Sequence, residues 1–104
     1  MMTTLEKVKR LEQYIIFNNS TVDPVLDMSI NKLLVREYAR MNELKTRLLN
    51  QVMKFEQAYS LASSEFYTRY EKGEMGDEMD FVEWAATVEM LANVDQNLTL
   101  LHEE

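Results

Sequence analysis

Hydrophobic and polar residues recur with helical spacing along almost the whole chain. The pattern predicts four helices, over residues 4–17, 24–60, 64–72 and 78–102. The chain contains two glycines and one proline, and an all-β fold needs many more turn residues than this. We therefore expect an all-α fold: an elongated helical hairpin or bundle of about four helices, forming a single domain over residues 1–104 and built on one long central helix.

The first predicted helix has clear start and stop signals. Thr3 and Glu6 have the spacing of a capping box, in which each side chain satisfies a free backbone N–H of the other residue. Asn18, Asn19 and Ser20 are expected to end the helix, because asparagine tolerates the left-handed conformation of a helix cap. The predicted buried stripe is Leu5, Val8, Leu11 and Ile15.

The second predicted helix is the main structural element. Asp23 is expected to cap it, Pro24 suits its first position, and Asp27 favours the positive end of the helix dipole. At 1.5 Å per residue it would be on the order of 55 Å long. Its predicted stripe consists of Leu26, Ile30, Leu33, Met41, Leu44, Leu48, Val52, Phe55 and Tyr59, widened by Leu34, Tyr38, Leu49 and Met53. Several of these positions repeat every eleven residues, which is typical of a nearly straight helix. Such a wide face can hold two helices, or one helix and a second protomer.

The two remaining helices flank a glycine-containing turn. Ser63 or Ser64 is expected to cap the third helix and Gly73 to end it. Asp77 is the expected N-cap of the fourth helix. The predicted buried stripe of that helix is Phe81, Trp84, Ala85, Val88, Leu91, Ala92, Leu98 and Leu101, interrupted by the polar Asp95.

Charge is distributed unevenly along the chain. Residues 1–54 hold nine Lys/Arg and six Asp/Glu, whereas residues 55–104 hold two Lys/Arg and twelve Asp/Glu. The acidic half would attract a basic partner and repel nucleic acid. The basic half is too dilute to predict nucleic-acid binding. Ordinary solvation of helix surfaces is the simpler interpretation of these charges.

Several functional classes find no support in the sequence. The chain has no cysteine, and therefore no disulfide, thiolate metal site or cysteine nucleophile. It shows no phosphate-binding glycine loop, nucleophile elbow or zinc-ligand spacing, and its acids do not follow the pattern of a calcium-binding loop. His102, the only histidine, lies near the chain end without an evident catalytic partner. No signal peptide or membrane-spanning run is recognisable. We expect a cytoplasmic protein that is not an enzyme and has no catalytic residue, metal or cofactor.

The segment 71–84, EKGEMGDEMDFVEW, is the most distinctive part of the chain. It contains both glycines, six acids and the only tryptophan. These acids could occupy a positively charged groove of a basic protein partner, and the aromatic residues beside them could serve as anchors. The candidate partner-binding residues are Phe66, Tyr67, Tyr70, Glu71, Glu74, Asp77, Glu78, Asp80, Phe81, Glu83 and Trp84. A structural interpretation is also open, in which Asp77 and Asp80 serve the helix start and Phe81 and Trp84 belong to the core.

Residues 55–84 resemble a family of small helical prokaryotic proteins. Members carry FE-x-x-Y, then S-x-x-F, then G-x-x-G-D-x-x-D-F-x-E-W. The matching positions here are Phe55, Glu56, Tyr59, Phe66, Gly73, Gly76, Asp77, Asp80, Phe81, Glu83 and Trp84. The DPVL start of the long helix is similar too, so the resemblance covers nearly the whole chain. The family is associated with antitoxins encoded beside TumE-like toxins, and it implies neutralisation of a toxin by binding, without catalysis.

Three functional classes follow from these observations. The first is an antitoxin of a type II toxin–antitoxin pair, which binds a basic, RNA-targeting toxin through its acidic and aromatic surface. The second is a self-associating helical scaffold or adaptor, so a homo-oligomer or a hetero-complex is expected. The third is a DNA-binding regulator that would use Lys7, Lys9, Arg10, Arg36, Arg40 and Arg47, but the chain has no helix-turn-helix signature.

Overall fold

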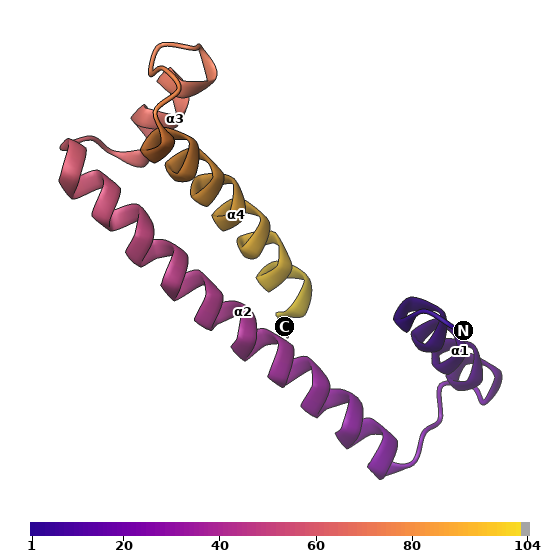
Figure 1. Cartoon of the computed structure of the whole chain (residues 1–104). Helices are drawn as coiled ribbons and strands as arrows, with labels where there is room; N and C mark the ends of the chain where they lie inside the picture. The colour runs from indigo at the N-terminus through magenta and orange to yellow at the C-terminus, as the bar shows by residue number, and fades with distance from the viewer. Residues whose placement is uncertain (103–104) are drawn as a thin grey trace. The chain divides into compact units, whose positions relative to one another are not determined.

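The computed structural model describes residues 1–102, and over this range the chain is all-α and contains no strand (Figure 1). Helix α1 spans Thr4–Phe17, α2 spans Pro24–Tyr59, α3 spans Ser63–Glu71 and α4 spans Met79–Leu101. The four predicted helices are confirmed, and their ends differ from the prediction by at most one residue. Contacts along the chain define two compact units, residues 1–34 and the residues from Val35 onward.

The two predicted N-caps in the first part of the chain are confirmed. The Thr3 Oγ1 accepts a hydrogen bond of 3.1 Å from the backbone N–H of Glu6. The Glu6 carboxylate accepts a bond from the Thr3 hydroxyl at 3.2 Å, so this half of the capping box differs from the expected bond to the backbone. The Asp23 Oδ1 accepts from the N–H of Leu26 at 2.9 Å and caps α2, whose first residue is Pro24.

Gly73 ends helix α3, as the sequence predicts. Its φ of +75° is in the left-handed region, and its N–H donates to the Tyr70 carbonyl at 3.0 Å. The N–H of Glu74 donates to the Arg69 carbonyl at 3.0 Å, which completes a Schellman motif. Asn19 has a φ of +59° just after α1, as expected for an asparagine at a helix cap.

The N-cap predictions for α3 and α4 are wrong. The N-cap of α3 is Ala62 instead of Ser63 or Ser64, and the N-cap of α4 is Glu78 instead of Asp77. Neither cap residue makes a side-chain hydrogen bond to its helix. The first bonds of α4 go to the carbonyl of Glu78, so this helix begins one residue later than a cap at Asp77 would require.

The unit of residues 1–34 contains α1 and the first turns of α2, and none of its residues is buried. Leu5 and Val8 are 62% and 55% exposed, while Leu11 and Ile15 are half-buried. The prediction of a buried stripe along α1 is therefore wrong. A unit this small encloses too little volume to take apolar side chains fully out of water.

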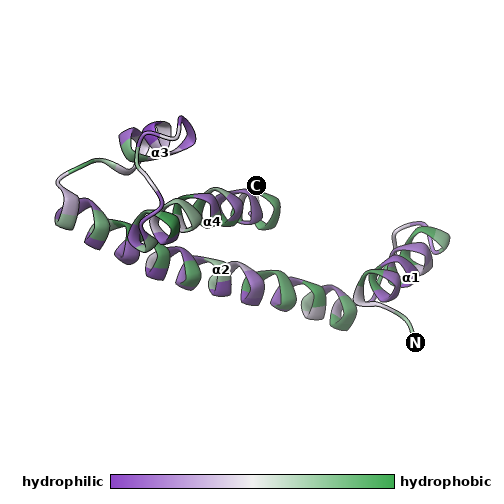
Figure 2. Cartoon of the chain, turned by 45° about the horizontal axis from the view of Figure 1, so that its top comes forward, coloured by the Kyte–Doolittle hydropathy of each residue, from purple (hydrophilic) through white to green (hydrophobic). Residues whose placement is uncertain are grey.

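The second unit is a helical hairpin closed by a short helix. In Figures 1 and 2, α4 runs back alongside the later part of α2, and α3 lies at the end where α2 stops. Leu48 of α2 packs with Val94 and Leu98 of α4 to form one buried cluster. Beside it, the Lys45 ammonium and the Asp95 carboxylate form an ion pair of 2.7 Å. Asp95, the expected polar break in the α4 stripe, therefore has a partner on α2.

Burial along α2 is narrower than predicted. Leu48 and Val52 are buried, but the flanking Leu49 and Met53 are exposed. Along the predicted α2 stripe, Met41, Leu44 and Phe55 are half-buried, whereas Leu33 and Tyr59 are exposed. One neighbouring helix covers only part of a face that wide, and this accounts for the difference.

Burial along α4 also departs from the prediction. Thr87 and Val94 are buried although neither belonged to the predicted stripe, and Ala92 is exposed. The reason is that α4 has two different neighbours, α3 near its start and α2 along its length, so its covered side is not one straight line. The Thr87 hydroxyl donates to the Glu83 carbonyl at 2.8 Å, which satisfies this buried polar group.

Replacing Gly73 with alanine is expected to destabilise the fold by about 1 kcal/mol, because an added Cβ disfavours the left-handed backbone conformation. Chemical denaturation followed by circular dichroism would measure the loss. Gly73→Asn is the matched control and should lose less, since asparagine tolerates this conformation. Equal stability of Gly73→Ala and the wild type would contradict the role given to the Schellman motif.

Candidate protein-interaction surface at the α3–α4 junction

The indole of Trp84 lies at the centre of the junction between α2, α3 and α4. It stacks on the ring of Phe66 from α3, with ring centroids 3.9 Å apart and planes inclined by 3°. The ring of Phe55 from α2 is also nearly parallel to it, at 5.6 Å and 13°. Trp84 and Phe66 are both 0% exposed. One aromatic residue from each of three helices therefore forms this core.

Polar contacts fix the same core. The Trp84 Nε1–H donates to the Ser63 Oγ at 2.9 Å, so the only polar atom of the buried indole is satisfied. The backbone N–H of Ser63 donates to the Glu56 Oε2, also at 2.9 Å. Glu56 of α2 thus binds a free N–H at the start of α3, where the Ala62 side chain has no acceptor.

A second contact joins the end of α2 to the start of α4. The Tyr59 hydroxyl donates to the Asp80 Oδ2 at 2.6 Å, and the Tyr59 ring lies 5.1 Å from the ring of Phe81 between centroids. The hydrogen bond to Asp80, helped by partial desolvation, raises the pKa of Tyr59. Asp80 therefore has a structural role within the junction in addition to its charge.

Phe66 and Trp84, two of the expected partner anchors, offer no surface to a partner, and their assignment is corrected to the core. Both side chains are 0% exposed, and their neighbours all belong to this chain. Most positions that carry the family resemblance have an architectural role here: Phe55, Glu56, Tyr59, Phe66, Gly73, Asp80, Phe81 and Trp84. The signature is therefore largely explained by how three helices meet.

The three other aromatic candidates occupy the edge of this core. Tyr67, Tyr70 and Phe81 are half-buried and pack against the cluster of Phe66 and Trp84. Each leaves part of its side chain accessible. They are compatible with contact to a partner at the margin of the junction, although none projects from it as an isolated anchor.

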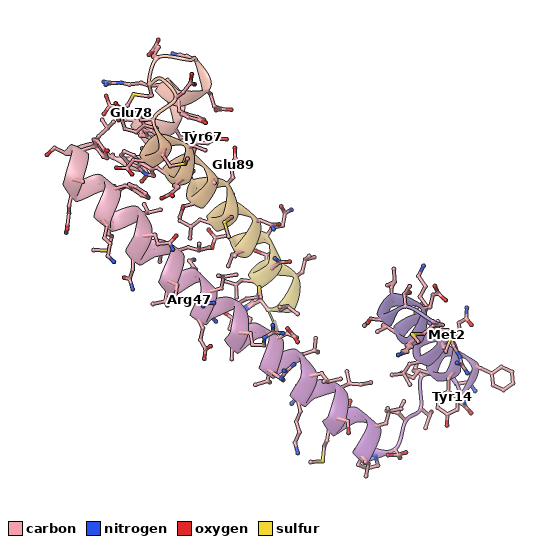
Figure 3. The ribbon with its side chains drawn as sticks, viewed as in Figure 1. Met2, Tyr14, Arg47, Tyr67, Glu78 and Glu89 are labelled. Atoms are coloured by element: carbon pink, nitrogen blue, oxygen red, sulfur yellow. The ribbon has the colours of Figure 1, made fainter. Side chains whose placement is uncertain are left out.

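The acidic candidates do reach solvent. All six are exposed: Glu71, Glu74, Asp77, Glu78, Asp80 and Glu83. We refer to these six residues as the acidic surface. Within residues 1–102 none of them forms an ion pair, and Arg69 of α3 pairs with Glu65 instead, at 2.6 Å. The end of α3, the turn and the start of α4 thus carry exposed negative charges that form no ion pair; Figure 3 labels Glu78 in this segment.

Tyr67 makes a contact that the sequence did not reveal. Its hydroxyl donates to the Glu89 Oε1 at 2.8 Å and links α3 to α4, and Figure 3 shows the two side chains at the upper end of α4. This hydrogen bond is the main cause that raises the pKa of Tyr67 to about 12, with desolvation and nearby negative charge adding to it. The two residues are 22 positions apart, and no local pattern connects them.

The structure adds exposed apolar residues beside the acidic surface. Met79 and Val82 are exposed on α4, although neither was among the predicted site residues. A helical projection of the sequence would have found them, because their spacing places them away from Phe81 and Trp84. The surface therefore combines negative charge with accessible apolar side chains.

The described residues limit the chemistry that this surface supports. Over residues 1–102 no three or more His, Asp or Glu side chains are grouped closely enough to hold a metal ion. In the same range no helix has the length and apolar character required to cross a membrane. What the arrangement offers is an exposed negative surface on a rigid helix junction.

Comparison with known proteins gives no further assignment. No protein-family model matches the chain, and no match was found among curated proteins or solved structures.

Replacing Ser63 with alanine is expected to destabilise the fold by about 1–2 kcal/mol, because the buried Trp84 Nε1–H loses its acceptor. The neighbouring Ser64, which is exposed, provides the matched control: Ser64→Ala changes helix propensity in the same way but should leave stability nearly unchanged. Denaturation followed by Trp84 fluorescence measures both variants, since Trp84 is the only tryptophan. Equal stability of the two variants would refute the structural role of the Ser63 hydroxyl.

The raised pKa of Tyr67 gives a pH dependence with a defined sign. Because the folded state favours the neutral phenol, its contribution to stability is complete below pH 10 and is lost as the pH rises to about 12. Glu89→Gln is expected to lower the pKa of Tyr67 towards 10, whereas Glu83→Gln, which removes a charge without a tyrosine partner, should not. Ultraviolet titration of phenolate, compared with a Tyr67→Phe variant, would test this. An unchanged titration in Glu89→Gln would contradict it.

Proposed function

We propose that this chain acts by binding a basic protein, and that it is the antitoxin of a type II toxin–antitoxin pair. The observation that carries the proposal is the acidic surface, whose six carboxylates are exposed and form no ion pair within residues 1–102. Keeping like charges together costs free energy unless an opposite charge approaches them. The resemblance of residues 55–84 to antitoxins encoded beside TumE-like toxins supports the same function.

The mechanism we propose is competition for a positively charged groove. A toxin that acts on RNA binds phosphates through lysine and arginine side chains. Carboxylates of the acidic surface would form ion pairs with those side chains and exclude RNA. Long-range attraction would mainly raise the association rate, and short-range contacts would retain the complex.

The contacts that retain the complex differ from those expected from the sequence. Trp84 and Phe66 are fully buried, so they support the surface from below without touching the partner. The accessible parts of Tyr67 and Tyr70, together with Met79 and Val82, are available for contact. The burial of the stacked rings gives the surface a fixed geometry, which reduces the entropy lost on binding.

Self-association as a scaffold is the alternative function. Three apolar side chains on α2 within the second unit, Val35, Leu49 and Met53, are 59%, 42% and 51% exposed. Exposed apolar side chains along a helix favour contact with another helix. Light scattering separates the two functions: a scaffold forms a stable oligomer on its own, whereas the antitoxin requires its partner.

The proposed function predicts that the product of the adjacent reading frame co-purifies with this chain. Reversing the charge of two exposed acids, in the double variant Glu74→Lys/Glu78→Lys, is expected to weaken that binding by about tenfold or more and to abolish growth rescue on co-expression. Binding would be measured by calorimetry at low and moderate salt, where the wild-type affinity should fall as salt rises.

The matched control is Glu43→Lys, which reverses an exposed acid on α2 about 24 Å along the helix from its end at Tyr59. This variant should bind as the wild type does. Equal binding by the wild type and Glu74→Lys/Glu78→Lys would show that the acidic surface is not the contact. Absence of any binding to the neighbouring product would count against the antitoxin assignment itself.

A further inference from the structure

Helix α4 is apolar on more than the side that faces its neighbours. It is the most apolar of the four helices, and its apolar residues are not confined to one face. Trp84, Val94 and Leu98 are buried, yet Met79 and Leu100 near its two ends are 71% and 79% exposed. An exposed line of apolar side chains on a helix is normally covered by another element. In the second unit α4 has neighbours on only part of its circumference (Figure 2).

Six of the exposed residues of α4 lie on one face, and five of the six are apolar. Successive members are three, four or seven positions apart, which places them on one face of an α-helix. We call this set the outer stripe: Met79, Val82, Ala86, Met90, Asn93 and Leu100. All six are exposed, and the stripe extends over roughly 30 Å of helix. It begins at the acidic surface and continues along α4 away from it.

Charge specifies the kind of partner that fits the outer stripe. Between Met79 and Leu101, helix α4 contains acidic residues but neither lysine nor arginine. Helical spacing places Glu83 on one side of the stripe and Glu89 on the other. An apolar partner without charge would leave the Glu83 carboxylate without a partner and would offer no counter-charge to Glu89, which accepts only the neutral hydrogen bond of Tyr67. An acidic partner would be repelled. A partner with lysine or arginine on both sides of an apolar strip would pair with them.

The shape of the stripe specifies the partner's secondary structure. The outer stripe, which is apolar except at Asn93, is about 30 Å long, and this length corresponds to one face of a helix of about 20 residues. The small Ala86 in the middle allows another helix to approach closely, and the methionines on either side adapt to the side chains opposite them. Over residues 1–102 there is no strand edge to which an extended peptide could add.

We propose that the outer stripe of α4 docks a basic amphipathic helix of the partner protein. This inference rests on the proposed function and states how the partner is held: the acidic surface attracts it, and the outer stripe buries its apolar face. The helix of the partner lies along α4 with its lysine or arginine side chains beside Glu83 and Glu89.

The test uses the full chain and two labelled helical peptides of about 20 residues, with leucine at the heptad core positions and either lysine or glutamate elsewhere. Fluorescence anisotropy is expected to show binding of the leucine–lysine peptide and not of the leucine–glutamate peptide. The variant Ala86→Lys/Met90→Lys should weaken that binding by about tenfold or more. The control Met28→Lys/Ala39→Lys makes the same two kinds of change at exposed positions of α2 and should bind as the wild type does.

Folding of each variant is checked by thermal unfolding, and Ala86→Gln/Met90→Gln provides a second, uncharged variant. This variant should also weaken binding of the lysine peptide, but by less than Ala86→Lys/Met90→Lys does, because it removes apolar surface without adding positive charge. Binding of the lysine peptide that is unchanged in both variants would overturn the proposal. Equal binding of the glutamate peptide would overturn it as well, because charge would then play no part.

Two further outcomes separate this inference from the proposed function. If the neighbouring gene product still binds Ala86→Lys/Met90→Lys but not Glu74→Lys/Glu78→Lys, helix docking is wrong while capture by the acidic surface stands. If light scattering shows a wild-type oligomer that Ala86→Lys/Met90→Lys dissociates, the stripe is covered by a second copy of this chain and the docking proposal is overturned.

Discussion

The stacking of Trp84 with Phe66 and Phe55 is the interaction on which the second unit depends. The three rings come from α4, α3 and α2, and two of them are completely removed from solvent. Large aromatic side chains bury more surface per residue than aliphatic ones, so a few of them hold together a unit with few buried residues. The hydrogen bond from Trp84 to Ser63 then fixes the indole, and with it the angle at which α3 meets α4.

This packing separates two roles within one short segment. From Glu71 to Trp84 the residues that face inward make the core, and the carboxylates between them remain in solvent. Asp80 belongs to both groups, because it is exposed and also accepts the hydrogen bond of Tyr59. A rigid aromatic core beneath the acids is what allows repelling charges to be held together, since the repulsion is too weak to separate three helices that share buried rings.

The sequence predicts best those helix ends that have a local chemical signal. Pro24 after Asp23 and the left-handed Gly73 are decided by residues close to them in the chain, and both predictions are confirmed. Contacts between distant residues carry no such signal. Ser63 and Trp84 are 21 positions apart, and nothing in the spacing indicates that one binds the other.

The candidate site was predicted in part, for the same reason. The exposed acids could be identified because charged side chains rarely lose water. The aromatic residues could not be divided between core and surface, since Phe66 and Tyr67 are adjacent and both suit either place; the structure buries the first and leaves the second half-exposed. Which side of α4 is covered depends on where α2 and α3 lie. The positions of α2 and α3 are set by tertiary packing, and the helical spacing of residues within α4 carries no information about them.

The burial of Trp84 also constrains how any partner can be held. A partner that inserted between the stacked rings would have to break the contacts that join α3 to α4, so recognition must use what already lies at the surface. Protein interfaces place apolar contacts at the centre and charges at the rim, because carboxylates that lose water without a good partner oppose binding. By helical spacing, Glu83 and Glu89 lie on opposite sides of the line of exposed apolar residues on α4, and this rule favours that arrangement. In the complex that we propose, the carboxylates would select the partner from a distance, and the exposed methionines and leucine would determine how long it stays.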